Sequence, residues 1–294
     1  MPLRRVARAA IPLLAALAAC TAAREAAAQR VTERHDFGDG EGKLISFYSS
    51  ALTFSPVEAP AASAPWSWRA GVELSYLPRL SPEQRRVGDK PEATNLAPIF
   101  PRPRALIALP GGVSAEASWI PPVKLFDVKA NVGSFALARP FAVAPALLLT
   151  PRIGATVGQV EGAITCSPDM QEEGPDLVEY YQIICNGRSS DDHFQPRLAT
   201  GELVASWVRR AAVAPYAGAG VRRDWSRFDI GVTTPDGGRD PDHPILEIRA
   251  TRPYLFAGAT WRAAPRLGAS GELFWAPGSL VTFRLQGSFH ARGR

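Results

Sequence analysis

The strongest constraint in this sequence is a two-residue alternation of apolar and polar residues that continues over long segments. Between Phe141 and Val157 most odd positions are large and apolar, whereas the even positions are small or polar. The same period returns over 66–76 and over 281–290, where Arg284 lies in the middle of the polar face. Because successive side chains of a β-strand point to opposite faces, this period predicts strands with one apolar and one polar face. The 27 prolines and 25 glycines, which weaken helix interiors, also favour β-structure.

The alternating runs predict ten antiparallel strands that follow one another along the chain. We expect them near residues 66–77, 104–110, 113–120, 123–138, 141–160, 193–210, 212–229, 246–262, 266–276 and 279–291. Long connections alternate with tight ones, such as 110–112 and Arg139-Pro140. An even strand number with tight turns at one end and long loops at the other predicts an all-β fold, an up-and-down transmembrane β-barrel. Eight strands, if the short runs at 104–110 and 113–120 are lost, or twelve are the alternatives.

The strands of a soluble β-sandwich also alternate apolar and polar residues, so the kinds of residue on each face decide between the two architectures. Several runs reach fifteen residues or more, which is longer than the usual strand of a soluble sheet. Tryptophans recur near the ends of the apolar faces, where a membrane barrel has its aromatic girdles, at positions 66, 119, 207, 261 and 275. The competing sandwich would bury Trp68, Val72, Leu147 and Phe283 in protein, whereas the barrel exposes them to lipid.

The polar faces carry charges of both signs, which a wet barrel interior accepts. The predicted lumen residues are Arg69, Glu73, Glu116, Asp127, Lys129, Arg152, Glu202, Arg222, Asp224, Arg252, Glu272 and Arg284. Opposite charges in a narrow barrel can interlock as ion pairs that fill the interior, and we favour this packed arrangement. A narrow polar path, in which the arginines would favour small anions, is the alternative.

By architecture the chain resembles the small bacterial outer-membrane β-barrel proteins of the porin-like superfamily over residues 66–294. The final strand looks like the terminal assembly signal of that superfamily, with Gly287 and Phe289 in its second half, although 291–294 replace the usual terminal aromatic residue. The resemblance implies a location in the outer membrane of a Gram-negative bacterium, contact with outer-membrane lipid and insertion by the barrel assembly machinery. We expect a structural or surface-exposed envelope protein with at most a narrow pore, and a small-solute channel is the alternative.

The first 28 residues predict a signal peptide. A basic start at 2–8 and an apolar run at 9–23 precede 26–28, three alanines that fit a cleavage site. Cys20 leaves a lipoprotein as the alternative. Removing four arginines and one glutamate with the leader lowers the net charge from +5 to +2, which gives nucleic-acid binding no electrostatic basis. Residues 29–65 are expected to form a periplasmic extension, an additional strand or a plug in the lumen, and the sequence leaves all three open.

Cysteines and histidines are few, so the chemistry open to this chain is limited. In an oxidising compartment, Cys166 and Cys185 should form a disulfide that staples one long loop. The four histidines form no metal-binding or nucleophile motif. We therefore expect neither an enzyme nor a metal or other cofactor.

Two groups of residues nevertheless suit specific chemistry. The first is an acidic rim cluster of long-loop residues, formed by Asp191, Asp192, His193, Asp240 and Asp242. It suits a divalent cation or the Asp and Asp-His pairs of an outer-membrane aspartyl protease, but solvated turn residues are the simpler interpretation. The second is Ser288 with His290 on the polar face of the last strand. This pair fits a barrel lipid hydrolase or, more simply, a histidine that makes an ordinary hydrogen bond.

Overall fold

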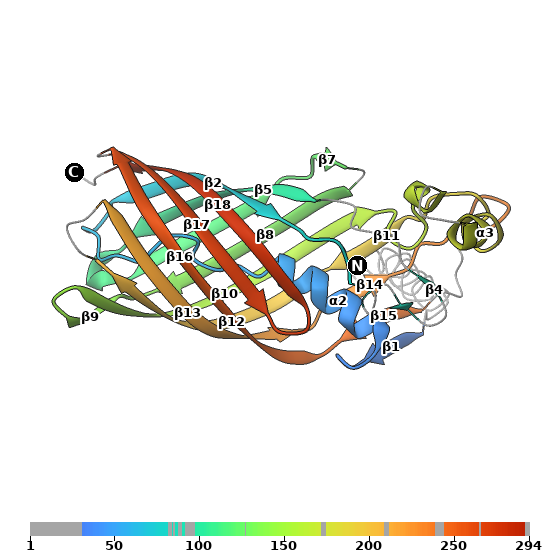
Figure 1. Ribbon diagram of the computed structural model, residues 1–294, viewed down its shortest axis with the longest axis horizontal. Coiled ribbons are helices and arrows are strands. Elements are labelled where there is room, and N and C mark those ends of the chain that lie inside the picture. Colours follow the sequence, from blue (N-terminus) through green and yellow to red (C-terminus); the bar gives the residue numbers. More distant parts are fainter. Residues whose placement is uncertain are drawn as a thin grey trace, which may run out of the picture.

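The computed structural model describes residues 31–81, 84, 86–87, 90–91, 98–126, 128–171, 175–208, 212–238, 244–264 and 266–291. Within this part, ten strands pair in one antiparallel cycle (Figure 1). They are β2 (Trp68–Tyr76), β5 (Ile99–Ala108), β6 (Ser114–Ile120), β8 (Val128–Ala138), β10 (Leu147–Gly162), β12 (Arg197–Trp207), β13 (Val213–Asp224), β16 (Ala250–Ala264), β17 (Leu267–Ala276) and β18 (Leu280–Ala291). β18 pairs with β2, for example through Leu285 and Leu74, and so closes the barrel. The predicted ten-stranded barrel is confirmed, and the sandwich alternative is wrong.

The two ends of the barrel differ in their connections. Short connections join the strands at the turn end, where β2 begins and β18 ends, whereas the long segments leave the opposite, loop end. One predicted turn is wrong, because the chain does not reverse at Arg139-Pro140. It continues as β9 (Phe141–Ala144), which pairs with β10 through Ala144 and Leu147. Pro140 has no backbone N–H to donate, so it interrupts the ladder without reversing the chain. Another turn, η1 (Pro110–Gly112), needs glycine because Gly111 has a φ of 81°.

The outward faces of the barrel strands form an apolar belt. Trp68 is 45% exposed, Val72 47% and Phe283 47%, which is what the barrel predicts and the sandwich excludes. Leu147, at the turn end, is half-buried. Tryptophans flank the belt near the turn end, at 68, 207 and 261, and near the loop end, at 119 and 275. A closed sheet also pairs its backbone polar groups internally, so this surface suits a barrel that spans a membrane.

At the loop end the sheet continues beyond the barrel. β11 (Asp192–Gln195), β14 (Arg227–Asp229), β15 (Ile245–Ile248) and β1 (Thr32–His35) follow β10 in this order, and β1 runs parallel to β15. The adjoining loop contains η2 (Pro168–Gln171), α3 (Pro175–Ile183) and the disulfide Cys166–Cys185, which confirms the predicted pairing. β7 (Lys124–Leu125) pairs with β8, and β3 (Arg86–Val87) pairs with β4 (Lys90–Pro91). None of the described helices is long and apolar enough to cross a membrane.

The N-terminal segment lies inside the barrel. α2 (Gly40–Ala51) occupies the loop-end mouth, and the chain then runs extended through the lumen to the turn end, where β2 begins (Figure 1). The helix fits this space because Ser46, Ser49 and Ser50 are small, and all three are fully buried. Ser50 Oγ donates to the carbonyl of Ser46 at 2.7 Å, and Thr53 Oγ1 donates to that of Ser49 at 3.0 Å. These bonds satisfy carbonyls near the helix end. Residues 52–60, which follow the helix, are called the lumen strap below.

Candidate functional site

A continuous chain of ion pairs crosses half of the barrel wall around the lumen strap. It joins Glu73 of β2, Arg104 of β5, Glu116 of β6, Arg152 of β10 and Glu202 of β12, which we call the charge network. Arg104 lies 2.6 Å from Glu73 and 2.7 Å from Glu116. Arg152 lies 3.0 Å from Glu116 and 2.9 Å from Glu202. Since each arginine bridges two carboxylates, one on either side of its own strand, the charges offset one another where water is excluded.

The opposite half of the wall uses tyrosines and further arginines. Tyr254 donates its hydroxyl to Glu202 at 2.6 Å, and Tyr216 donates to Glu272 at 3.1 Å. Arg284 lies 3.8 Å from the same Glu272. The buried carboxylates of this half therefore have hydrogen-bond or charge partners within the wall.

The arginines of the wall also bind the backbone of the lumen strap. Four consecutive strap carbonyls, of residues 52–55, each accept a hydrogen bond from a different arginine. The carbonyl of Leu52 accepts from Arg102 at 3.4 Å and that of Thr53 from Arg284 at 2.9 Å. The carbonyls at 54 and 55 accept at 2.6 Å from the arginines at 152 and 104, respectively. An extended strand without a sheet partner would leave these buried acceptors unsatisfied, and the guanidinium groups supply the missing donors.

Phe54 fills the centre of the lumen. Its side chain has no exposed surface. The guanidinium carbon of Arg104 lies 4.4 Å from the ring centroid, that of Arg152 4.8 Å and that of Arg102 5.9 Å. Cations at such distances are attracted to the ring faces of aromatic side chains. The ring therefore packs among cations that also bind the strap backbone.

The remaining contacts hold the strap along its length. Toward the loop end, Arg222 donates to Ser50 Oγ at 2.8 Å and to Thr53 Oγ1 at 2.9 Å. Toward the turn end, the backbone N–H of Val57 donates to Glu272 at 3.1 Å. Glu58 lies 3.0 Å from Arg69 of β2. The strap is thus bound at both ends of the lumen as well as at its centre.

The structure places ten of the twelve predicted lumen residues on the inner wall. Nine of them take part in the contacts of the strap, the helix or the wall: Arg69, Glu73, Glu116, Arg152, Glu202, Arg222, Asp224, Glu272 and Arg284. The tenth, Arg252, places its guanidinium carbon 3.4 Å from the ring centroid of Phe37 and donates to the carbonyl of Pro277 at 2.9 Å.

Lys129 is not in the lumen, which corrects its predicted position. In β8 the buried side chains are those of Val132, Ser134 and Ala136, so the even positions face inward. Lys129 is odd-numbered, exposed and paired with Glu161 at 3.2 Å. Predicting the inner face from charge alone failed here, because the described inward side chains of β8 are uncharged. Asp127, the other predicted lumen residue of this strand, lies outside the described residues.

Arg102 and Arg104 are the main functional residues that the sequence analysis missed. The predicted strand began at 104, because Pro101 and Pro103 interrupt the run. In the structure both prolines lie within β5 and pair with β2 positions, and the arginines between and after them point inward. The alternation of proline and arginine over 101–104 is itself a two-residue period, and it is the signal that could have found them.

Of the acidic rim cluster, the structure describes Asp191, Asp192 and His193. Asp192 is fully buried and accepts hydrogen bonds from the backbone N–H groups of Ile164, Thr165 and Gly231 at 2.6–2.9 Å. It therefore organises the loop around the disulfide. Asp191 is exposed and lies 3.3 Å from His193. Asp240 and Asp242 lie outside the described residues. Among the residues that the structure describes, no group of three or more His, Cys, Asp or Glu could hold a metal ion.

Ser288 and His290 are close together at the turn end, but a third residue changes their chemistry. Ser288 Oγ lies 3.1 Å from His290 Nε2. The hydroxyl proton is donated to Glu58 of the lumen strap. Because the serine has one proton, the histidine cannot accept it in this arrangement, and the pair is not poised as nucleophile and base.

Glu247 on β15 lies outside the membrane-spanning strands among arginines. Arg249 lies 3.4 Å away, Arg227 3.5 Å and Arg34 3.6 Å. Burial raises the pKa of Glu247, but the hydrogen bond from Arg249 and the charges of Arg249 and Arg227 lower it by more. The net pKa is below the ordinary value for glutamate. The ionised carboxylate therefore links β1, β14 and β15 at the loop end.

No family model and no curated protein sequence matches the chain. Among solved structures, an outer-membrane channel from Pseudomonas putida F1 is similar at 7% identity with a TM-score of 0.43, over 81% of this chain and 100% of that one. The outer-membrane protease OmpT from Escherichia coli is similar at 10% identity with a TM-score of 0.38, over 79% of this chain and 96% of that one. The NanC porin is similar at 7% identity with a TM-score of 0.33, over 75% and 98%. These similarities concern the barrel alone.

Proposed function

We propose that the protein is an outer-membrane β-barrel of the cell envelope whose lumen is closed by its own N-terminal segment. The observation that carries this proposal is the set of four consecutive strap carbonyls bound by four different arginines around the buried ring of Phe54. Hydrogen bonds to charged groups contribute about 1.5–3 kcal/mol each. Several of them acting together make thermal release of the strap rare, so the resting barrel does not conduct.

The surface of the molecule supports the same proposal. The outward apolar belt with flanking tryptophans suits a lipid surrounding, and insertion would use the barrel assembly machinery. The loop end, with its additional strands and the stapled loop, would then face the cell exterior and present the protein's most elaborate surface. In this arrangement the role is structural and surface-exposed, and no enzyme activity is proposed.

A small-solute channel that opens when the strap is released is the second candidate. It is favoured by the polar character of the strap contacts, because water can replace hydrogen bonds to serine, backbone and arginine groups more readily than it can replace a dry apolar interface. The charged wall would then line the open passage.

Single-channel conductance in planar bilayers tests both candidates. We expect the full mature chain to give no conductance steps, and a variant with residues 52–60 replaced by a Gly/Ser linker of equal length to conduct steadily. Each variant is compared boiled and unboiled on a gel, since a migration shift on boiling shows that the barrel has closed. Spontaneous steps of the full chain would favour the channel, and a folded linker variant without conductance would contradict closure by the strap.

A further inference from the structure

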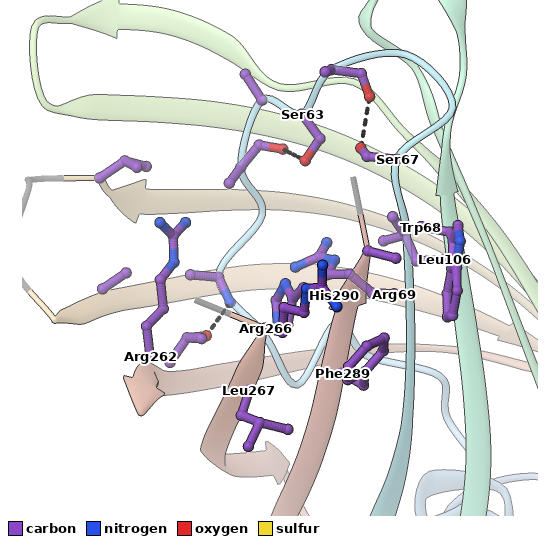
Figure 2. Close-up of a pocket in the computed structure, with 18 of the residues that line it drawn as sticks. Ser63, Ser67, Trp68, Arg69, Leu106, Arg262, Arg266, Leu267, Phe289 and His290 are labelled. Carbon is purple, nitrogen blue, oxygen red and sulfur yellow. Dashed lines mark hydrogen bonds between the residues drawn. The ribbon is translucent and has the colours of Figure 1, made fainter. Parts of the chain in front are cut away.

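A cavity of about 850 Å³ lies at the turn end of the barrel, below the lumen strap. Its walls come from the residues that follow the strap, from the beginning of β2 and from the turn-end parts of β5, β13, β16, β17 and β18 (Figure 2). Much of the lining is alanine, which leaves the cavity wide. Cavities of this volume accommodate molecules of small-metabolite size. We call it the turn-end vestibule.

The titratable groups of the turn-end vestibule are mainly cationic. Arg69, Arg262, Arg266 and His290 line it, and Figure 2 shows them around one open space. The neighbouring strands bring these groups together: His290 pairs with Arg69 in the register of β18 and β2, and the backbone N–H of His290 donates to the carbonyl of Arg266 at 2.8 Å. One carboxylate, that of Glu58, reaches this group.

Glu58 offsets the charge of one arginine and leaves two others unmatched. It lies 3.0 Å from Arg69 and accepts a hydrogen bond from the hydroxyl of Ser288. Within the described part of the chain, Arg262 and Arg266 have no ion pair, and both are exposed to the open space. Two guanidinium groups beside a cavity, without a protein anion, form a positive potential that attracts anions.

The local packing keeps this space open. Gly268 of β17 pairs with Arg262 of β16 on one side and with Ser288 of β18 on the other. A Cβ at Gly268 would lie 2.9 Å from His290 Nε2 and 2.9 Å from Ser288 Oγ. Glycine at this position therefore allows the imidazole to lie over β17, next to the arginines.

From this geometry we propose that the turn-end vestibule binds a small organic anion that carries carboxylate or phosphate groups. Arginine suits this class of ligand because its planar guanidinium donates two parallel hydrogen bonds to a pair of carboxylate or phosphate oxygens. Arg262 and Arg266 bind the anionic groups, and the apolar and alanine-rich lining contacts the remainder of the molecule. The site lies on the turn-end side of the strap, so an anion binds there while the lumen is closed.

Isothermal titration calorimetry of the folded full mature chain in detergent tests this proposal, with citrate and pyrophosphate as probes and glucose as a neutral control. At low ionic strength, where charge interactions are least screened, we expect at least one anion to bind with one-to-one stoichiometry and glucose not to bind. The double variant R262Q/R266Q should weaken binding by about tenfold or more, since two charge-assisted contacts are lost. Binding of citrate alone assigns carboxylates, binding of pyrophosphate alone assigns phosphates, and binding of both supports the shared chemistry.

Arg139→Gln is the matched control. Arg139 is also exposed at the turn end, but it lies over the ring of Phe141 and does not line the vestibule. Its replacement removes one positive charge, as a single variant at Arg262 or Arg266 does, and should leave the affinity unchanged. The proposal is overturned if neither anion binds, or if R139Q weakens binding as much as a single variant at Arg262 or Arg266, because diffuse surface charge would then explain the result. Conductance is not part of this measurement, so its outcome is independent of whether the strap seals the lumen.

Discussion

Phe54→Ala should convert the closed barrel into one that opens often, because Phe54 contributes to closure and not to the barrel wall. The side chain has no exposed surface and packs against three guanidinium groups. Truncating a fully buried phenylalanine to alanine costs about 3–5 kcal/mol. In the proposed opening, the strap leaves the lumen while the barrel wall stays folded, so the cost falls on the equilibrium between closed and open states. Since each 1.4 kcal/mol is a factor of ten, the closed-to-open ratio should fall by roughly two to three and a half powers of ten.

Open probability in planar bilayers measures this ratio directly. We expect brief, repeated conductance steps from Phe54→Ala under conditions in which the unaltered chain is silent. Phe283→Ala is the matched control, because Phe283 is 47% exposed on the outward face of β18 and lies away from the strap. An unaltered open probability in a Phe54→Ala barrel that still shifts on boiling would refute the reasoning, because closure would then depend on another part of the chain.

Three further predictions concern the wall, the chain direction and the loop end. Arg152→Met should lower the free energy of unfolding in urea by about 3–5 kcal/mol, because it leaves the buried Glu202 without its ion pair. Lys129→Met, which breaks an exposed pair, should lower it by less than about 1 kcal/mol. Val31→Cys should react with a membrane-impermeant maleimide on intact cells and Ala62→Cys only after permeabilisation, since the segment runs from the loop end to the turn end; the reverse pattern would contradict the proposed orientation. Because the pKa of Glu247 is lowered in the folded protein, the ionised carboxylate stabilises the loop end at any pH above the ordinary glutamate pKa. This contribution is lost as the pH falls through the lowered pKa. The protection factors of the β1 and β15 amides, which are exchange rates corrected for the intrinsic pH dependence, should therefore fall in acid, and Glu247→Gln should remove this fall.

The lumen holds both the predicted ion pairs and the N-terminal segment. The packed arrangement of ion pairs is present in the charge network, where Arg104 and Arg152 bridge three carboxylates. These pairs do not fill the lumen by themselves. A barrel of ten strands leaves more space than its wall side chains occupy, and the N-terminal segment takes up that space. The arginines therefore do two things. They offset the charge of the wall carboxylates, and they donate hydrogen bonds to the backbone of the lumen strap, which has no sheet partner.

The strand number, the barrel architecture and most inward-facing charges follow from the sequence by itself. Alternation is a local property, because the pleat of each strand sends successive side chains to opposite faces whatever its neighbours are. The disulfide was also predictable, since Cys166 and Cys185 are the two cysteines that follow the leader. Even the short runs that form β5 and β6 were recognised, although Pro101 and Pro103 concealed the first half of β5.

The tertiary structure alone decided what occupies the lumen and which residues meet there. Residues 31–65 have no period that distinguishes an extension from a plug, because their backbone partners are side chains of distant strands, such as Arg104 for Ser55 and Arg152 for Phe54. Lys129 shows the same limit, since charge does not reveal the inner face of a strand whose inward residues are small. The turn-end vestibule likewise exists only because register places Arg262, Gly268 and Ser288 side by side on three strands. Pairing between segments that are far apart in the chain is a property of the closed sheet, and no local pattern of residues encodes it.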